Sequence, residues 1–249
     1  MKSLIEWVAS APYPQAISAL VVENLIVFGF ALVFGRVLVR MYATRRVALE
    51  PLPLAKIEVA AAAGCVLMNT CVTILGLVLW RNDIIRFRTD VGVWAWLDVV
   101  ALLLIMDFLM YFLHRIAHHP LLFGLMHRLH HDYDRPRPLT LFVLNPFENL
   151  SFGLLWLGVV WAHDWSWLGM SVYLFLNVMF GTLGHLGVEP FPDWWGRTPI
   201  LRHIAGSTFH ARHHQDVTGN FGFYTTIWDQ LFRTLRKDYW RTFGAMPEK

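Results

Sequence analysis

The sequence predicts an all-α protein, a multi-pass membrane helical bundle with about four to five membrane helices, including a hairpin, and a histidine-rich cytoplasmic cap. Three observations favour this fold class. Hydrophobic residues make up 56% of the 249 residues and the mean hydropathy is +0.44, whereas apolar usage is roughly half in soluble domains. Charged residues are only 16%. Six of the twelve histidines lie between His114 and His131, directly after an apolar segment. We expect a single domain over residues 1–249.

Five apolar segments are candidate spans, since a helix of about 20 residues crosses a ~30 Å hydrocarbon core. The first three are expected at residues 16–39, 59–80 and 94–113. Residues 146–162 and 166–188 form two arms joined by a short turn, which predicts a helical hairpin. The first arm is near the lower limit of length for a full crossing. The bundle is therefore expected to have four or five membrane helices.

The distribution of basic residues predicts the orientation. The connection between the first two spans carries more of them than the next connection, so it is expected to be cytoplasmic. The third span then brings His114 to the cytoplasmic face, and the two crossings of the hairpin return the chain to that face. Residues 189–249 are polar enough for a cap, with a short helix around residues 227–235. No dense basic stripe is present, so the net charge of +3 favours anionic lipid headgroups over nucleic acid, which we do not expect as a partner. Ordinary positive-inside topology explains the basic residues better than either.

Eight histidines fall into three clusters with helical spacing. His114 and His118 form an HxxxH pair, and two HxxHH clusters follow at His127, His130 and His131 and at His210, His213 and His214. On a helix, the i+3 residue is rotated about −60° and the i+4 residue about +40° from the first. The rings of each HxxHH therefore diverge to two sides, which suits two adjacent metal ions with each cluster contributing to both. Neutral imidazole binds iron, zinc and copper, so the spacing predicts a metal-binding cap without choosing the metal.

Three further residues are candidates for this site. His185 lies near the end of the second hairpin arm and should emerge at the same face, which makes it a candidate ligand. Asp107 lies two helical turns before His114, and a carboxylate in a membrane helix needs a partner. The natural partner is a histidine N–H or another donor beside the site, since ligating imidazoles are usually oriented by such acceptors. The alternative is a hydrogen bond to another helix, away from the site. Glu148, just inside the hairpin, is a similar candidate for orienting a ligand.

The remaining histidines are weaker candidates. His119 should turn about 100° away from His118, toward the surroundings of the site or the lipid headgroups. His163 lies at the hairpin tip, on the opposite face, and is expected to be structural. His203 precedes His210 by seven residues, and its role is left open.

The stretch HRIAHHPLLFGLMHRLHH, from His114 to His131, resembles the first two histidine boxes of the fatty acid hydroxylase/sterol desaturase superfamily, integral-membrane di-iron oxygenases. HARHHQDVTGNFGFYTTIWDQLFRT resembles the third box with its asparagine-aromatic-glycine turn and WDxxF segment. The resemblance covers roughly residues 95–234. It implies the eight clustered histidines as ligands and His185 as a ninth. Some members have another histidine four residues before that ninth, where this chain has Gly181; whether His203 or another group takes its place stays open.

The resemblance implies two iron ions, for which zinc can substitute in purified protein, and O2 as co-substrate. It also implies a lipid substrate, such as a fatty acyl chain or sterol, that is hydroxylated or desaturated at an unactivated C–H bond. Electrons are expected from a separate donor, a ferredoxin or a b-type cytochrome with its reductase. Arginine outnumbers lysine 17 to 4, which favours a bacterial inner membrane over the endoplasmic reticulum.

Two other classes of function compete with this reading. A non-catalytic metal-binding or metal-transport protein is the alternative, although transport sites lie near the membrane midplane among discontinuous helices. A bis-histidine haem carrier needs ligands on opposite sides of the iron, whereas histidines at i and i+4 approach from one side.

Overall fold

The computed structural model describes residues 2–246. Among them, four helices are long and apolar enough to cross a membrane: α2 (Tyr13–Met41), α3 (Lys56–Arg81), α4 (Val93–Ala117) and α8 (Trp167–Gly184). A fifth apolar helix, α7 (Pro146–Trp161), has 16 residues and is about 24 Å long at 1.5 Å per residue, less than a full core thickness. The predicted mostly helical fold is confirmed, with four full-length candidate membrane spans among the described residues.

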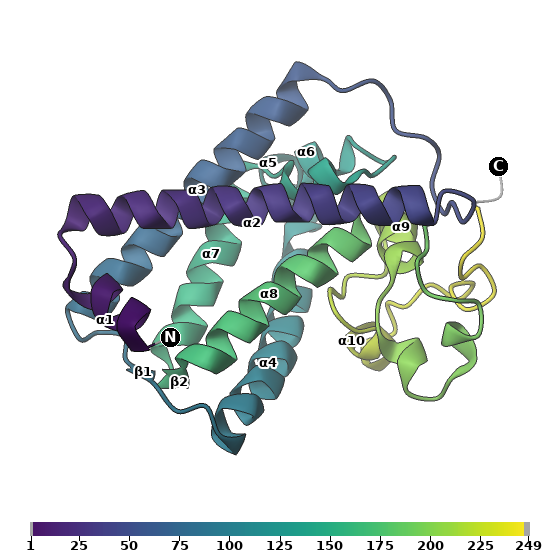
Figure 1. Ribbon diagram of the computed structural model, residues 1–249. Helices are drawn as coiled ribbons and strands as arrows, with labels where there is room; N and C mark the ends of the chain where they lie inside the picture. The colour runs from purple at the N-terminus through teal and green to yellow at the C-terminus, as the bar shows by residue number, and fades with distance from the viewer. Residues whose placement is uncertain (1, 247–249) are drawn as a thin grey trace.

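The long helices pack in a ring, in which α4 lies between α7 and α8. Helix α4 packs against α7 and α8, and α3 packs against α2 and α7 (Figure 1). Leu102, Met106 and Met110 of α4 form the largest buried cluster together with Tyr173 of α8. Small residues let these helices approach closely, as is usual in membrane bundles: a Cβ at Gly153 of α7 would lie 2.5 Å from a methyl group of Val72.

The connections between the helices separate into two ends of the molecule. At one end, the two-residue strand β1 (Phe87–Arg88) pairs in parallel with β2 (Trp165–Ser166). Asp98 is buried there and accepts hydrogen bonds from Arg88 Nη2 and Ser166 N at 2.9 and 2.7 Å. At the other end, Arg46 and Val188 form an isolated bridge that joins the first connection to the segment after α8. The helices therefore alternate in direction, as the count of crossings predicts.

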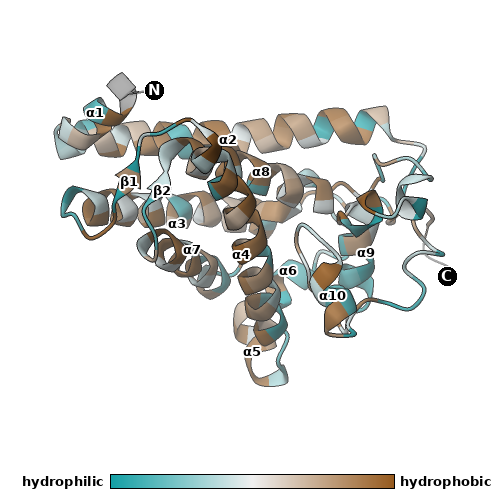
Figure 2. Cartoon of the chain, turned by 90° about the horizontal axis from the view of Figure 1, so that it is seen from below, coloured by the Kyte–Doolittle hydropathy of each residue, from teal (hydrophilic) through white to brown (hydrophobic). Residues whose placement is uncertain are grey.

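The second end carries the histidine-rich region. Short helices α5 (Pro120–Met126) and α6 (Arg128–His131) follow α4, and a 3-10 turn, η1 (Pro138–Phe142), leads to α7. The polar C-terminal region holds η2 (Trp195–Arg197), η3 (Leu201–His203), α9 (Ser207–Gln215) and α10 (Ile227–Leu231). Figure 2 shows the apolar α2, α3, α4 and α8 beside this more polar region. The N-terminal helix α1 (Lys2–Ser10) lies at the opposite end, where Arg81 binds the carbonyls of Val8 and Ala11.

The first turn of α9 is anchored by a buried carboxylate. Glu189 accepts hydrogen bonds from Thr208 N at 2.8 Å and from Thr208 Oγ1 at 2.7 Å. Eight of the nine residues of α9 are buried, so this helix is enclosed by the protein on all sides. The helix predicted around residues 227–235 is present as α10 but ends at Leu231.

Candidate metal centre

The structure brings the nine predicted histidines together in two neighbouring groups. The five-histidine group contains His114, His118, His127, His131 and His213, and the four-histidine group contains His130, His185, His210 and His214. Within each group, the nitrogen atoms that face one another lie within 4.8 Å. Segments up to a hundred residues apart in sequence therefore meet at one place, as the even number of hairpin crossings predicts.

Each HxxHH cluster divides between the two groups. His127 and His131, four residues apart, stay together, whereas His130 faces the four-histidine group. In α9 the division is reversed: His210 and His214 belong to the four-histidine group and His213 to the other. The predicted divergence of the rings is confirmed. Each HxxHH cluster contributes histidines to both groups.

The Nε2 atoms converge within each group. In the five-histidine group, His114 Nε2 lies 2.9 Å from His127 Nε2 and 3.3 Å from His118 Nε2. His131 and His213 approach to 3.1 Å through the same atoms. In the four-histidine group, His185 Nε2 lies 3.2 Å from His130 Nε2 and 3.0 Å from His210 Nε2. Every one of these contacts joins two ring nitrogens.

The opposite ring nitrogen, Nδ1, faces an oxygen acceptor in five of these rings. The four carbonyl acceptors are Phe221 O for His114, Val143 O for His130, Gly181 O for His185 and Gly219 O for His213, at 2.9, 3.2, 2.7 and 2.7 Å. The fifth acceptor is Glu148, whose Oε1 lies 2.5 Å from His127 Nδ1. A carbonyl oxygen only accepts, so Nδ1 must carry the proton. In the neutral ring the Nε2 atom then carries a lone pair directed into its group.

These residues fit a bound metal ion. In the pairs His114–His127 and His130–His185, two Nε2 lone pairs face each other, at 2.9 and 3.2 Å, an arrangement that repels unless a cation lies between them. Imidazoles whose other nitrogen donates to a carbonyl or carboxylate are the usual ligands of protein metal sites. The five-histidine group and the four-histidine group can therefore hold metal.

Burial keeps the rings in the neutral form that metal requires. Removal from solvent is the main cause that lowers the pKa of His210, His213 and His214 well below the ordinary value, and neighbouring imidazoles add to it. The same cause lowers the pKa of His185 to about 4. Because metal competes with protons for these nitrogens, a depressed pKa favours metal binding near neutral pH.

Of the two acidic candidates, Glu148 touches a clustered histidine and Asp107 does not. Glu148 is buried at the start of α7, where it meets His127. No histidine among the described residues contacts Asp107, so the prediction of a histidine partner is wrong. Asp107 instead accepts hydrogen bonds from Tyr224 N, Thr225 Oγ1 and Trp228 Nε1, at 2.8, 2.6 and 3.0 Å. The segment after α9 folds back onto α4 and supplies these donors.

The other histidines lie outside the two groups. His119 is exposed and accepts from Leu121 N at the start of α5. His163 lies 3.4 Å from Arg88 at the opposite end of the bundle. His203 contacts Gln230 at 2.9 Å and adds no ligand to the four-histidine group. At Gly181 a Cβ would lie 2.8 Å from Leu141, so a side chain there requires Leu141 to move.

Sequence reasoning missed two buried acids that shape the site. Asp229 accepts from the amides of Phe221 and Gly222, at 2.8 and 2.7 Å, and Glu189 holds the start of α9. Asp229 belongs to the WDxxF segment, so the motif could have pointed to it. Glu189 stands in a polar stretch with no periodicity that marks it as buried.

The sequence of this chain is similar to a known protein family and to several known proteins. Residues 99–234 match the model of the fatty acid hydroxylase family. A candidate methylsterol monooxygenase from Dictyostelium discoideum is 31% identical over 153 residues, which cover 58% of this chain and 53% of the relative. Methylsterol monooxygenase 1 from Danio rerio is 31% identical over 133 residues (50% and 42%). A Delta(7)-sterol 5(6)-desaturase from Leptosphaeria maculans is 26% identical over 153 residues (60% and 40%).

The chain spans about half the length, or less, of these relatives. All three come from eukaryotes, and so they give no support to a bacterial inner membrane. No solved structure matched the chain. The family model covers more than half of the 249 residues. The matched region includes all nine clustered histidines, that is, the eight in the three boxes and His185. On this match, the chain belongs to the fatty acid hydroxylase family of the fatty acid hydroxylase/sterol desaturase superfamily.

Proposed function

We propose that this protein is a membrane-bound di-iron oxygenase. It would use O2 and external electrons to hydroxylate or desaturate an unactivated C–H bond of a lipid such as a sterol or a fatty acyl chain. The names of the relatives, methylsterol monooxygenase and sterol desaturase, support lipid oxidation. The nine clustered histidines are the proposed iron ligands, and zinc is the expected substitute in purified protein.

The division of each HxxHH between two groups is the observation that carries this proposal. Two adjacent groups of five and four imidazoles share their clusters, an arrangement suited to two neighbouring ions. A bound iron pair would supply the activation of O2 with two external electrons, giving an oxidant able to remove hydrogen from an unactivated C–H bond. The chain itself keeps the rings neutral, fixes the Nδ1 protons of five of them on oxygen acceptors, and places aromatic side chains around the five-histidine group.

Those aromatic side chains limit the access of water to the five-histidine group. The ring of Phe221 lies 5.3 Å from His118 and 5.6 Å from His213, and that of Phe223 lies 5.2 Å from His114. Phe123 covers His118 from the side of α5. An apolar surrounding protects a reactive oxidant from side reactions and suits an apolar substrate.

A metal-transport or metal-storage protein is the competing proposal. Its sites would be expected near the midplane, among discontinuous helices. Here His114 lies in the last turn of the continuous helix α4, and His185 directly follows α8. Ligands at the ends of uninterrupted helices favour a site at the membrane surface, which we propose is the cytoplasmic one. A separate electron donor, a ferredoxin or a b-type cytochrome with its reductase, could reach a site at that surface.

Isotope labelling tests the proposed reaction. Membranes that contain the protein, supplied with reductant and 18O2, are expected to form a lipid alcohol that is 18 Da heavier than its parent lipid, or an alkene 2 Da lighter. The product should be absent when the His130→Ala/His213→Ala double variant replaces the wild-type chain. If no oxygen-dependent lipid product distinguishes the two membranes, the oxygenase proposal fails for the lipids supplied.

An apolar groove of about 1050 Å³ between two apolar helices offers a route for the substrate. It runs between α4, from Trp94 to Leu109, and α7, from Leu154 to Ala162. Leu109, at the end of the groove nearest His114, packs against the same buried cluster as Phe152 and Phe223. Phe223 also contacts His114, so this cluster adjoins both the groove and the five-histidine group. We propose that a lipid chain enters from the bilayer along this groove.

Filling the groove is expected to impair oxidation without removing metal. Gly158 lines the groove, and no atom lies within 4 Å of a Cβ added there, so the side chain of Gly158→Leu starts in open space and extends into the groove. We expect product formation to fall by about tenfold or more, because small displacements of a bound substrate cost large factors in rate. Gly64→Leu is the matched control, since Gly64 on α3 is equally open and lies outside the groove. Equal activity of the two variants would reject this route while leaving the oxygenase proposal intact.

A further inference from the structure

One short loop contacts two clustered histidines that come from different helices. Gly219 O accepts from Nδ1 of His213 on α9 at 2.7 Å, and Phe221 O accepts from Nδ1 of His114 on α4 at 2.9 Å. Both rings belong to the five-histidine group. The two carbonyl groups are separated along the backbone by a single residue, Asn220, so its conformation determines how they are directed relative to each other.

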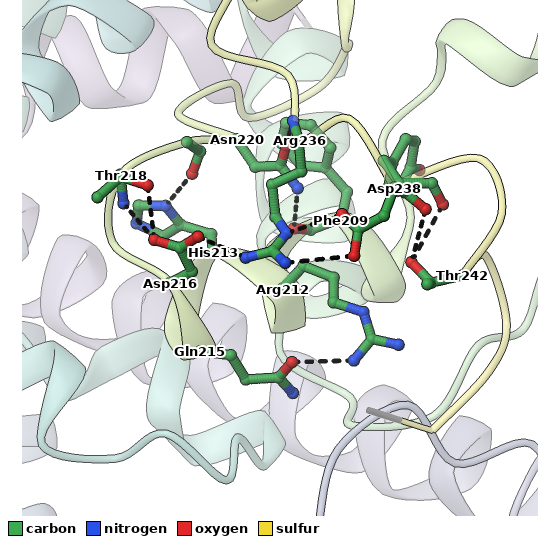
Figure 3. Close-up of polar contacts among 12 residues, drawn as sticks. Phe209, Arg212, His213, Gln215, Asp216, Thr218, Asn220, Arg236, Asp238 and Thr242 are labelled. Atoms are coloured by element: carbon green, nitrogen blue, oxygen red, sulfur yellow. Dashed lines mark hydrogen bonds and ion pairs between the residues drawn. The ribbon is translucent and has the colours of Figure 1, made fainter. Parts of the chain in front are cut away.

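Asn220 is fully buried and adopts a left-handed backbone conformation, with φ of +59°. Asparagine tolerates this region better than most residues other than glycine. Its amide bridges two segments: Nδ2 donates to Phe209 O at 3.0 Å, and Oδ1 accepts from Arg236 N at 3.0 Å (Figure 3). Its backbone N–H donates to Thr234 O at 2.9 Å. The side chain therefore ties the loop both to α9 and to the segment after α10.

The residues on either side of Asn220 restrict the loop further. Asp229 accepts from both Phe221 N and Gly222 N. A Cβ at Gly219 would lie 2.5 Å from Thr234 O, and one at Gly222 would clash with Thr225 O. Both glycines are thus needed where backbone segments approach closely. None of these contacts involves a metal ligand's Nε2, so they act on the loop independently of metal.

We propose that Asn220 is a positioning residue that holds His114 and His213 in one shared orientation for metal. Its left-handed backbone directs the carbonyls of Gly219 and Phe221 toward the two rings. Its amide fixes that backbone against Phe209 and Arg236. Both rings then present Nε2 to the same site although one belongs to a membrane helix and the other to the cap. The inference rests on the proposed metal site, and it assigns the asparagine-aromatic-glycine turn a role in building that site.

Asn220→Gly tests this role, because glycine keeps the left-handed backbone and removes both amide contacts. We expect the affinity of the five-histidine group for Zn²⁺ to fall by about 10–100-fold, as for other residues that orient metal ligands. The four-histidine group should keep its affinity. Titration of the purified, metal-free full chain with Zn²⁺ should therefore show one weakened and one unchanged site. Arg233→Gly is the matched control, since Arg233 is exposed, also has φ of +59° and lies outside the loop.

Thermal unfolding with and without Zn²⁺ separates positioning from general stability. A positioning role predicts that the rise in Tm caused by metal is smaller in Asn220→Gly than in Arg233→Gly. A merely structural role lowers the Tm of the metal-free chain and leaves that rise unchanged, which would overturn the inference. If Asn220→Gly does not fold, Asn220→Asp serves instead, because it tolerates the same backbone and loses the donation to Phe209 O. If the wild-type protein binds no metal, the proposed metal site itself is refuted. If the wild type and Asn220→Gly bind metal with equal affinity, the metal site stands and only the role of Asn220 is refuted.

Discussion

His130→Ala and His213→Ala are each expected to abolish oxygen-dependent lipid oxidation and to lower bound iron. His213 contributes Nε2 to the five-histidine group and His130 to the four-histidine group. Each replacement leaves neighbouring lone pairs in a buried site with fewer ligands, so the affected ion is lost. Because the two residues belong to different groups, the variants should each lose one ion of the pair. Iron per chain by elemental analysis and product by lipid mass spectrometry measure the two effects.

His119→Ala is the control for these two variants. His119 directly follows His118, yet its side chain is exposed and lies outside both groups. We expect wild-type iron content and activity from it. Full activity in His213→Ala would contradict the assignment of the five-histidine group, and full activity in His130→Ala would contradict that of the four-histidine group.

Glu148→Ala is expected to weaken metal binding by about 10–100-fold. Glu148 is buried, and its Oε1 lies 2.5 Å from His127 Nδ1. The carboxylate fixes the tautomer of the ring and raises its basicity as a ligand. Glu148→Gln keeps the shape and an acceptor but loses the negative charge, so its effect should be intermediate. Equilibrium titration of the metal-free variants with Fe²⁺ measures the affinity.

Glu58→Gln distinguishes this effect from the loss of any buried carboxylate. Glu58 is as deeply buried as Glu148, but it accepts from Ala55 N at the start of α3 and pairs with Arg137. Its replacement should lower the thermal stability and leave iron affinity unchanged. If Glu58→Gln and Glu148→Gln lower the iron affinity equally, Glu148 acts through stability alone.

Much of the fold and of the histidine set is predictable from local sequence. Span length and the loops between spans predict the long helices, because a bilayer imposes a minimum number of apolar residues. The even number of crossings in the hairpin predicts that His210 and His114 meet. Helical spacing also predicts that His127 and His130 point to different groups, even though α5 ends at Met126 and the cluster continues in a separate short helix.

What escapes the sequence depends on how loops fold back onto the bundle. Asp107 shares a helical face with His114, so spacing along α4 suggests a histidine partner, but the segment 223–228 folds back and supplies the donors instead. The roles of Gly219 and Phe221 also arise from this return of the chain, since both act through backbone carbonyls that any residue carries. Backbone acceptors leave no mark on side-chain chemistry, and so only a structure reveals them.

The metal content of the purified wild-type chain tests the central claim most directly. Two adjacent histidine groups predict two non-haem iron ions per chain after anaerobic loading with Fe²⁺. Elemental analysis combined with an optical spectrum should give this ratio without a Soret band. A chain that retains no iron under these conditions, or one whose iron is haem, would contradict the account.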